Sequence, residues 1–85
     1  MKNQPVLITF VVGVAAAPLS TSRRVFRGTI SAPPGNVGNV TVAGPDGGST
    51  AWIPGEYHDF EAINLQDLTG AGTVADTLTI VGESA

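Results

Sequence analysis

Residues 24–48 read RVFRGTISAPPGNVGNVTVAGPDGG. In residues 24–31 apolar and polar side chains alternate, which predicts a β-strand with Phe, Gly and Ile on one face. Residues 32–35 end that strand, because two prolines remove the N–H donors that a sheet ladder needs. Residues 39–43 alternate again, and residues 44–48 have the Gly, Pro and Asp composition of a turn. The stretch therefore predicts two short strands separated by tight connections.

The rest of the chain repeats this pattern outward from that stretch. Turn signals recur about every 8–12 residues, and no segment shows sustained helical periodicity, which is typical of a sandwich or barrel. Further strands are predicted at residues 6–12, 50–53, 56–63 and 74–82, with a helical turn at 64–68 and a loop at 70–72. The fold class is all-β, a small antiparallel β-sandwich or barrel of six to seven short strands. Its expected core residues are Phe26, Ile30, Val40, Val42, Leu78 and Ile80.

The front of the chain is the least usual segment. Residues 6–12 are rich in Val, Ile, Thr and Phe and have apolar residues on both faces, which predicts a strand covered on both sides. Lys2 followed by an apolar run and three alanines also has the outline of a secretory signal peptide, although one positive charge and an early Pro5 oppose it. We expect residues 1–22 to form an apolar strand or arm with its connector, and residues 23–85 to form the sandwich domain.

Size and charge both favour association with other chains. A domain of 85 residues without cysteine has little stability to spare and no disulfide to support it. All four bases precede residue 28 and all seven acids follow it, so the front carries +4 and the remainder −7. Such opposite charges allow the front of one copy to meet the body of the next.

Patterns that could support chemistry are weak. His58 could act as a base only with a serine nucleophile, and no nucleophile-elbow pattern exists. Asp59 and Glu61 lack the loop that calcium requires, and residues 70–75 lack the following helix of a dinucleotide fingerprint. A pI near 4.6 disfavours nucleic-acid binding by the arginines. We expect no enzyme activity, no cofactor, no metal, no small-molecule substrate and no membrane span.

A resemblance suggests a role. Residues 35–42 (GNVGNVTV) and 52–56 (WIPGE), with a Leu-containing segment and a closing strand after them, resemble small β-sandwich virion proteins of tailed bacteriophages. The resemblance implies a structural protein, foremost a capsid decoration (cement) protein on the capsid surface, assembled in the host cytoplasm. Its implied partners are the major capsid protein and sister copies, with a homotrimer as the expected assembly.

Two other functions remain open. Trp52 and Tyr57 flank a Pro-Gly turn and could stack on sugars, as in a carbohydrate- or receptor-binding module of a fibre or tail. A small secreted β protein is the second alternative. In the decoration protein we expect residues 6–12 to pair with a strand of a neighbour. The expected partner interface comprises Val6, Ile8, Phe10, Val12, Arg23, Arg24, Arg27, Trp52 and Tyr57.

Overall fold

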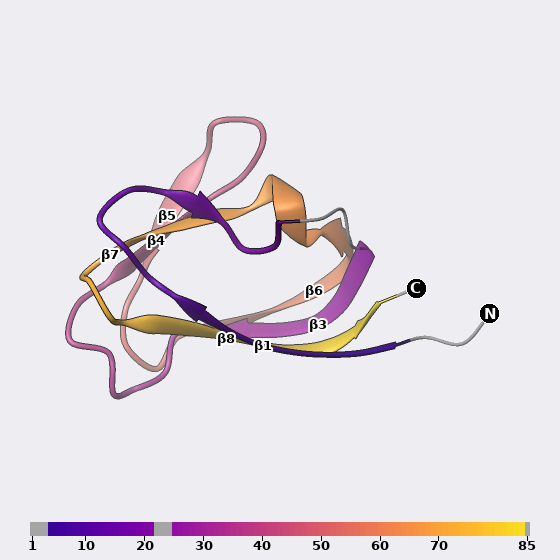
Figure 1. Ribbon diagram of the computed structural model, residues 1–85, viewed down its shortest axis with the longest axis horizontal. Helices are drawn as coiled ribbons and strands as arrows, with labels where there is room; N and C mark the ends of the chain where they lie inside the picture. The colour runs from indigo at the N-terminus through magenta and orange to yellow at the C-terminus, as the bar shows by residue number, and fades with distance from the viewer. Residues whose placement is uncertain (1–3, 22–24, 85) are drawn as a thin grey trace.

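The computed structural model describes residues 4–21 and 25–84, and it contains two sheets of four strands each (Figure 1). The elements in chain order are β1 (Gln4–Val11), β2 (Ala17–Pro18), β3 (Val25–Ser31), β4 (Val40–Ala43), β5 (Ser49–Trp52), β6 (Tyr57–Asn64), the 3-10 turn η1 (Leu65–Asp67), β7 (Thr69–Gly72) and β8 (Thr77–Ser84). Every strand pairing is antiparallel.

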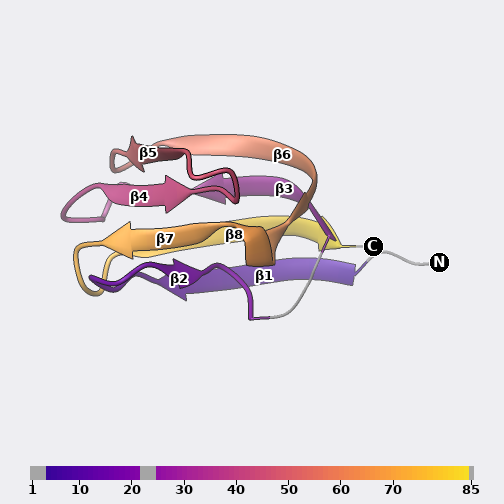
Figure 2. The same ribbon diagram turned by 90° about the horizontal axis from the view of Figure 1, so that it is seen from above.

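The two sheets lie face to face, which confirms the all-β sandwich. One sheet has the order β1-β8-β3-β6 and the other β2-β7-β4-β5. Figure 2 shows each strand of the first sheet opposite its partner in the second: β1 with β2, β8 with β7, β3 with β4, and β6 with β5. Besides the β2–β3 and β6–β7 connections, which also pass from one sheet to the other, each of these facing pairs is joined by one loop, which makes four such loops. All four lie at the same end of the molecule, opposite the two termini.

The core fills the space between the sheets. All six core residues expected from the alternation are buried, because successive side chains of a strand point to opposite faces. Trp52 of β5 and Leu65 of η1 belong to the same core. The buried apolar residues are Val6, Val12, Leu19, Phe26, Ile30, Ala32, Val40, Val42, Trp52, Leu65, Leu78 and Ile80.

The front of the chain is an integral strand of the sandwich, not an arm that precedes it. β1 pairs with β8 along its whole length, from Gln4 opposite Ser84 to Val11 opposite Thr77. Val6 and Val12 are each 1% exposed and fill the chain's own core. The strand was expected to be covered on both sides, but the chain itself covers only its inward face and leaves the outward face exposed, with Leu7 75% and Val11 66% exposed.

Two local expectations are also corrected. Residues 70–72 belong to β7 and not to a loop, and Gly70 is needed for packing: a Cβ there would lie 2.9 Å from the Phe10 ring. In the predicted strand at 56–63 strict alternation puts Ala62 on the same side as Phe60, but Ala62 has a positive φ of 50° and Ile63 packs against the core instead. The register of β3 against β6 shifts at the same place, so a β-bulge changes which residues face inward.

Candidate functional site

The four loops that join facing strands of the two sheets form a surface that we call the crossing-loop end, comprising residues 12–16, 32–39, 53–56 and 73–76. Hydrogen bonds join these loops in series, in the order of the strands that they connect. Gly72 N–H, directly before the 73–76 loop, donates to the Gly13 carbonyl of the 12–16 loop (3.0 Å). The Asp76 carboxylate then accepts from backbone N–H groups of the 32–39 loop. Gly55 N–H donates to the Ala32 carbonyl (2.6 Å), which joins the 53–56 loop to the 32–39 loop. The end is therefore one connected structure.

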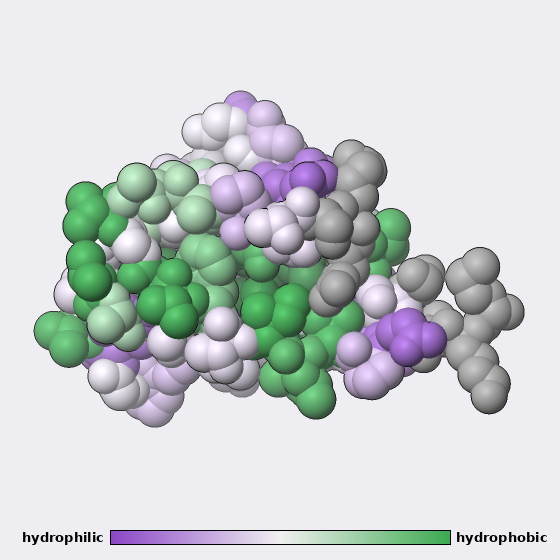
Figure 3. Space-filling view, viewed as in Figure 1, coloured by the Kyte–Doolittle hydropathy of each residue, from purple (hydrophilic) through white to green (hydrophobic). Residues whose placement is uncertain are grey.

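Each of these loops exposes one β-branched aliphatic residue. The four are Val14, Val37, Ile53 and Val74, with exposed fractions between 58% and 85%. Figure 3 shows hydrophobic residues gathered at this end of the molecule, on the side where β1 and β2 lie nearest the viewer. Residues from four separate parts of the sequence thus give one end of the sandwich an apolar character.

Asp76 and Asn36 fix the longest of the loops. The two carboxylate oxygens of Asp76 accept from the N–H groups of Val37 (2.8 Å) and Gly38 (2.9 Å), and Asp76 itself is buried. The Asn36 amide bonds both backbone groups of Thr77, accepting at 2.9 Å and donating at 2.8 Å. Because a buried carboxylate is costly without partners, these bonds account for its position. Val37 is consequently displayed on a rigid loop.

Glu56 fixes Ile53 in a similar way. One carboxylate oxygen accepts from the Ile53 N–H (3.1 Å), and the other lies 2.6 Å from Nε2 of His58, which donates to it. The hydrogen bond from His58, followed by that from Ile53, holds the pKa of the Glu56 carboxyl below its ordinary value. His58 thus acts as a structural partner of this turn.

The free edge of β1 is a second exposed surface. The backbone groups of Val12 point toward β8: its N–H donates to the Asp76 carbonyl (2.8 Å) and its carbonyl accepts from Ala75 N–H (3.1 Å), both just before β8. By the alternation of an antiparallel ladder, the N–H and C=O groups of Leu7, Thr9 and Val11 point the other way, toward the open edge. Their side chains point to solvent, with Leu7 75% and Val11 66% exposed.

The structure therefore changes which side chains of β1 could contact a partner. The expected interface used Val6, Ile8, Phe10 and Val12, which all turn toward the chain's own core. A groove of about 520 Å³ runs beside the open edge, lined by Ile8, Thr9, Phe10 and Val11 of β1 and by residues 18–21, which are the last residue of β2 and the three that follow it. Contact with this edge would use backbone groups and the groove.

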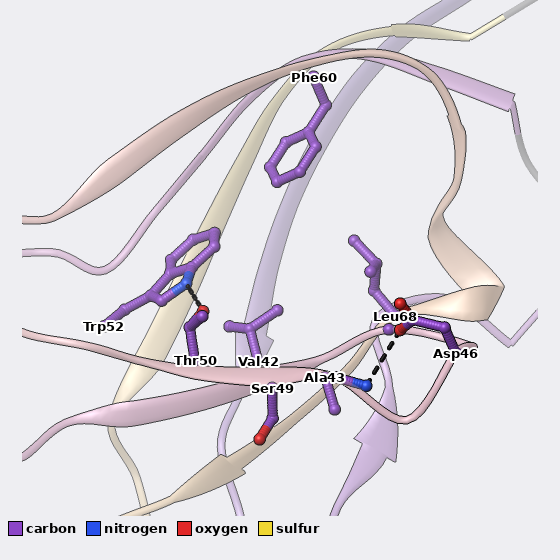
Figure 4. Close-up of a pocket in the computed structure, with 10 residues that line it drawn as sticks. Val42, Ala43, Asp46, Ser49, Thr50, Trp52, Phe60 and Leu68 are labelled. Atoms are coloured by element: carbon purple, nitrogen blue, oxygen red, sulfur yellow. Dashed lines mark hydrogen bonds between the residues drawn. The ribbon is translucent and has the colours of Figure 1, made fainter.

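Trp52 is buried, whereas Tyr57 is exposed on the surface. Trp52 is 3% exposed, its Nε1 donates to Thr50 Oγ1 (2.9 Å), and its ring stacks on Phe60 at 6.4 Å between centroids. Figure 4 shows the two rings on different sides of a pocket of about 410 Å³, Trp52 from β5 and Phe60 from β6. Tyr57 is exposed on the outer face of the other sheet. The two aromatic residues do not form a shared sugar-stacking surface, which was the basis of the carbohydrate-binding alternative.

The expected basic contact surface is only partly described. Arg27 lies opposite Glu83 on the outer face of the sheet, and the two form an exposed ion pair. The hydrogen bond from Arg27 to Glu83 raises the pKa of the guanidinium above its ordinary value. The charge of Arg27 is thus paired with Glu83 of the same chain. Arg23 and Arg24 lie outside the described residues.

Comparisons with protein-family models, with curated proteins and with solved structures gave no match to this chain. In residues 4–21 and 25–84 no group of three or more His, Cys, Asp or Glu side chains could hold a metal ion. No helix in the described part of the chain is long and apolar enough to cross a membrane.

Sequence reasoning missed the crossing-loop end altogether. Its signal was present, since Val14, Val37, Ile53 and Val74 are single aliphatics in or beside segments rich in Gly, Ala, Pro or Thr. Read locally, each is an unremarkable loop residue, because scattered exposed aliphatics are common in proteins. Only the pairing of the strands shows that the four loops share one end.

Proposed function

We propose that this chain is a structural virion protein, a decoration protein that binds the outer face of a bacteriophage capsid and stabilises it without catalysing a reaction. The observation that carries the proposal is the crossing-loop end, where four linked loops each present one exposed aliphatic side chain. The resemblance of residues 35–42 and 52–56 to tailed-phage virion proteins supports the same role. The partners are the major capsid protein and sister copies.

Rigid loops suit this role physically. Association is weakened when flexible groups must be ordered, so aliphatic residues on loops that are already fixed lose less free energy on binding. Burying a valine side chain contributes about 1.5 kcal/mol. A shell of repeated subunits offers many equivalent sites, and bridging two subunits multiplies weak contacts through effective concentration.

The direct test is the composition of virus particles. Particles purified from the source of this sequence should contain the chain at a fixed ratio to the major capsid protein, as measured by quantitative mass spectrometry. The chain should remain with the particles through repeated density-gradient sedimentation. Particles that contain the capsid protein but lack the chain, while free chain is present in the same lysate, would overturn the proposal.

The contact surface has its own test, in which purified chain is added back to particles made without it. The double variant Val37→Ser, Val74→Ser should bind at least about tenfold more weakly, since two buried valines contribute more than the 1.4 kcal/mol that tenfold represents. Val25→Ser is the matched control, because Val25 is an exposed valine at the start of β3, away from this end. Equal binding by the double variant and Val25→Ser would exclude the crossing-loop end as the contact.

A further inference from the structure

The two outer strands of the first sheet differ sharply in how their free edges are protected. Proteins prevent edge strands from pairing with other chains by placing charges, bulges or prolines on them. β6 has Asp59 and Glu61 on it and a bulge at Ala62. β1 carries no charged side chain over its eight residues, and its one proline, Pro5, lies near its start. β1 is thus a long edge with little protection.

The second sheet offers no comparable edge. Its outer strands are β2, which has two residues, and β5, which has four. Short edge strands give little length for pairing. Among the described strands, β1 therefore combines length, exposed apolar residues and outward-pointing backbone groups at Leu7, Thr9 and Val11.

We propose that the occupant of this edge is a second copy of the same chain, with β1 paired antiparallel to β1 across a two-fold axis. The first sheets of two copies would then join into one continuous sheet of eight strands. A two-fold contact of this kind uses the same surface on both copies. The contact is between copies, so it is independent of whether the chain binds a capsid, and it would replace the expected homotrimer by a dimer.

Charge is the reason for choosing a second copy. The chain has a net charge of −3, and its seven acids all follow residue 28, so most contacts between two bodies bring carboxylates together. A two-fold contact also places any charge that lies close to the axis near its own equivalent in the partner copy. Residues 3–22 contain no charged residue, and they supply both β1 and the groove wall at residues 18–21. Two copies can meet at this edge without repulsion.

The register follows from the direction of the backbone groups, because Leu7 and Thr9 of the two copies must face one another to form hydrogen bonds. Pairing the strands about Ile8 meets this condition and puts Ile8 opposite Ile8 of the partner copy, and Leu7 opposite Thr9. Leu7 and Thr9 are then hydrogen-bonded pairs, because their backbone groups face the edge, and Ile8 is a non-hydrogen-bonded pair with closer Cα atoms. Pro5 falls at the end of the ladder, where its missing N–H costs little. The partner's inward side chains lie over the groove beside Ile8 and Phe10.

Cysteine cross-linking tests both the contact and the register, and the natural chain contains no cysteine that would interfere. In Ile8→Cys the two sulfurs should meet on the two-fold axis and form an intermolecular disulfide under mild oxidation. A mixture of Leu7→Cys and Thr9→Cys should give mixed dimers faster than either variant alone. Glu61→Cys, on the protected edge, is the collision control and should cross-link slowly.

Sedimentation of the unmodified chain provides the second test, since Ile8→Cys could perturb the core. We expect a concentration-dependent dimer with a dissociation constant of about 1 µM or weaker, as for small interfaces. Thr9→Lys should raise the dissociation constant of the dimer by at least about tenfold, because it places a charge beside the partner strand. Thr79→Lys, directly opposite on the same face of β8, should dimerise normally.

The outcomes separate this inference from the capsid proposal. A chain that is monomeric up to about 1 mM, or an Ile8→Cys variant that cross-links no faster than Glu61→Cys, overturns the pairing even if the chain is found on particles. Cross-linking at Ile8 in a chain that is absent from particles overturns the capsid proposal and leaves the pairing intact.

Discussion

Asp76 is the residue on which the arrangement of the crossing-loop end depends most. It is buried, and its carboxylate accepts two backbone N–H groups from a loop almost forty residues away. Replacement by Ala leaves both donors without an acceptor, so Asp76→Ala should lower the free energy of unfolding by about 2–3 kcal/mol in urea titrations. Amide exchange at Val37 and Gly38 should accelerate.

Asp46→Ala is the matched control for this prediction. The Asp46 carboxylate also accepts from a backbone N–H, that of Gly48 at 3.0 Å, but on an exposed turn. Water can replace an exposed bond, so we expect a loss below about 1 kcal/mol. If both variants lose the same stability, the clamp by Asp76 has no special importance.

Glu56 gives the turn at Ile53 a pH dependence. Its pKa is lowered in the folded chain, so its hydrogen bonds stabilise the turn fully above the ordinary carboxyl pKa of about 4.3 and are lost as the pH falls through the lowered pKa. The Ile53 amide signal in NMR spectra should therefore change in acid and be constant at neutral pH. Glu56→Gln should abolish that change, and an unaltered titration in this variant would refute the assignment.

At the scale of elements, a pair of glycines sets the distance between β3 and β8. Gly28 lies opposite Gly82, and the Phe26 ring covers both: a Cβ on Gly82 would lie 2.8 Å from that ring and 2.7 Å from the Gly28 Cα. Overpacking of this kind costs about 1–3 kcal/mol. Gly82→Ala should therefore lower the free energy of unfolding by about 2–3 kcal/mol, as measured by chemical denaturation.

Gly35→Ala serves as the control for the glycine pair. Gly35 lies on the β3–β4 loop, and a Cβ there would have no neighbour within 4 Å. Its substitution should change stability by less than about 0.5 kcal/mol. A comparable loss in both variants would show that the space under Phe26 does not account for the effect at Gly82, since the lower entropy of the unfolded chain would by itself make Gly35→Ala slightly stabilising.

At the scale of the molecule, the two proposed surfaces lie in different places. The crossing-loop end is at the C-terminal end of β1, and antiparallel pairing of β1 would point these ends of two copies in opposite directions (Figure 1). A dimer would thus carry an apolar contact surface at each end of one continuous sheet. Such a bivalent unit could bridge two neighbouring subunits of a shell, which is the geometry that gains most from avidity.

The sequence by itself determined most of the strands, the sandwich and most of the core, because alternation and turn residues act locally. Phe26, Ile30 and Leu78 were placed correctly on that basis. Local reasoning was wrong where distant packing decides: at β7, whose glycines allow close packing, and at β6, where a bulge reverses the alternation.

Only the tertiary structure decided the exposed surfaces. It turned Val6 and Val12 inward, buried Trp52, and brought four aliphatic loop residues to one end. The physical reason is that strand order is set by contacts between residues far apart in the chain, such as β1 with β8, which are absent from any local pattern. Which side chains remain exposed for a partner follows from that order.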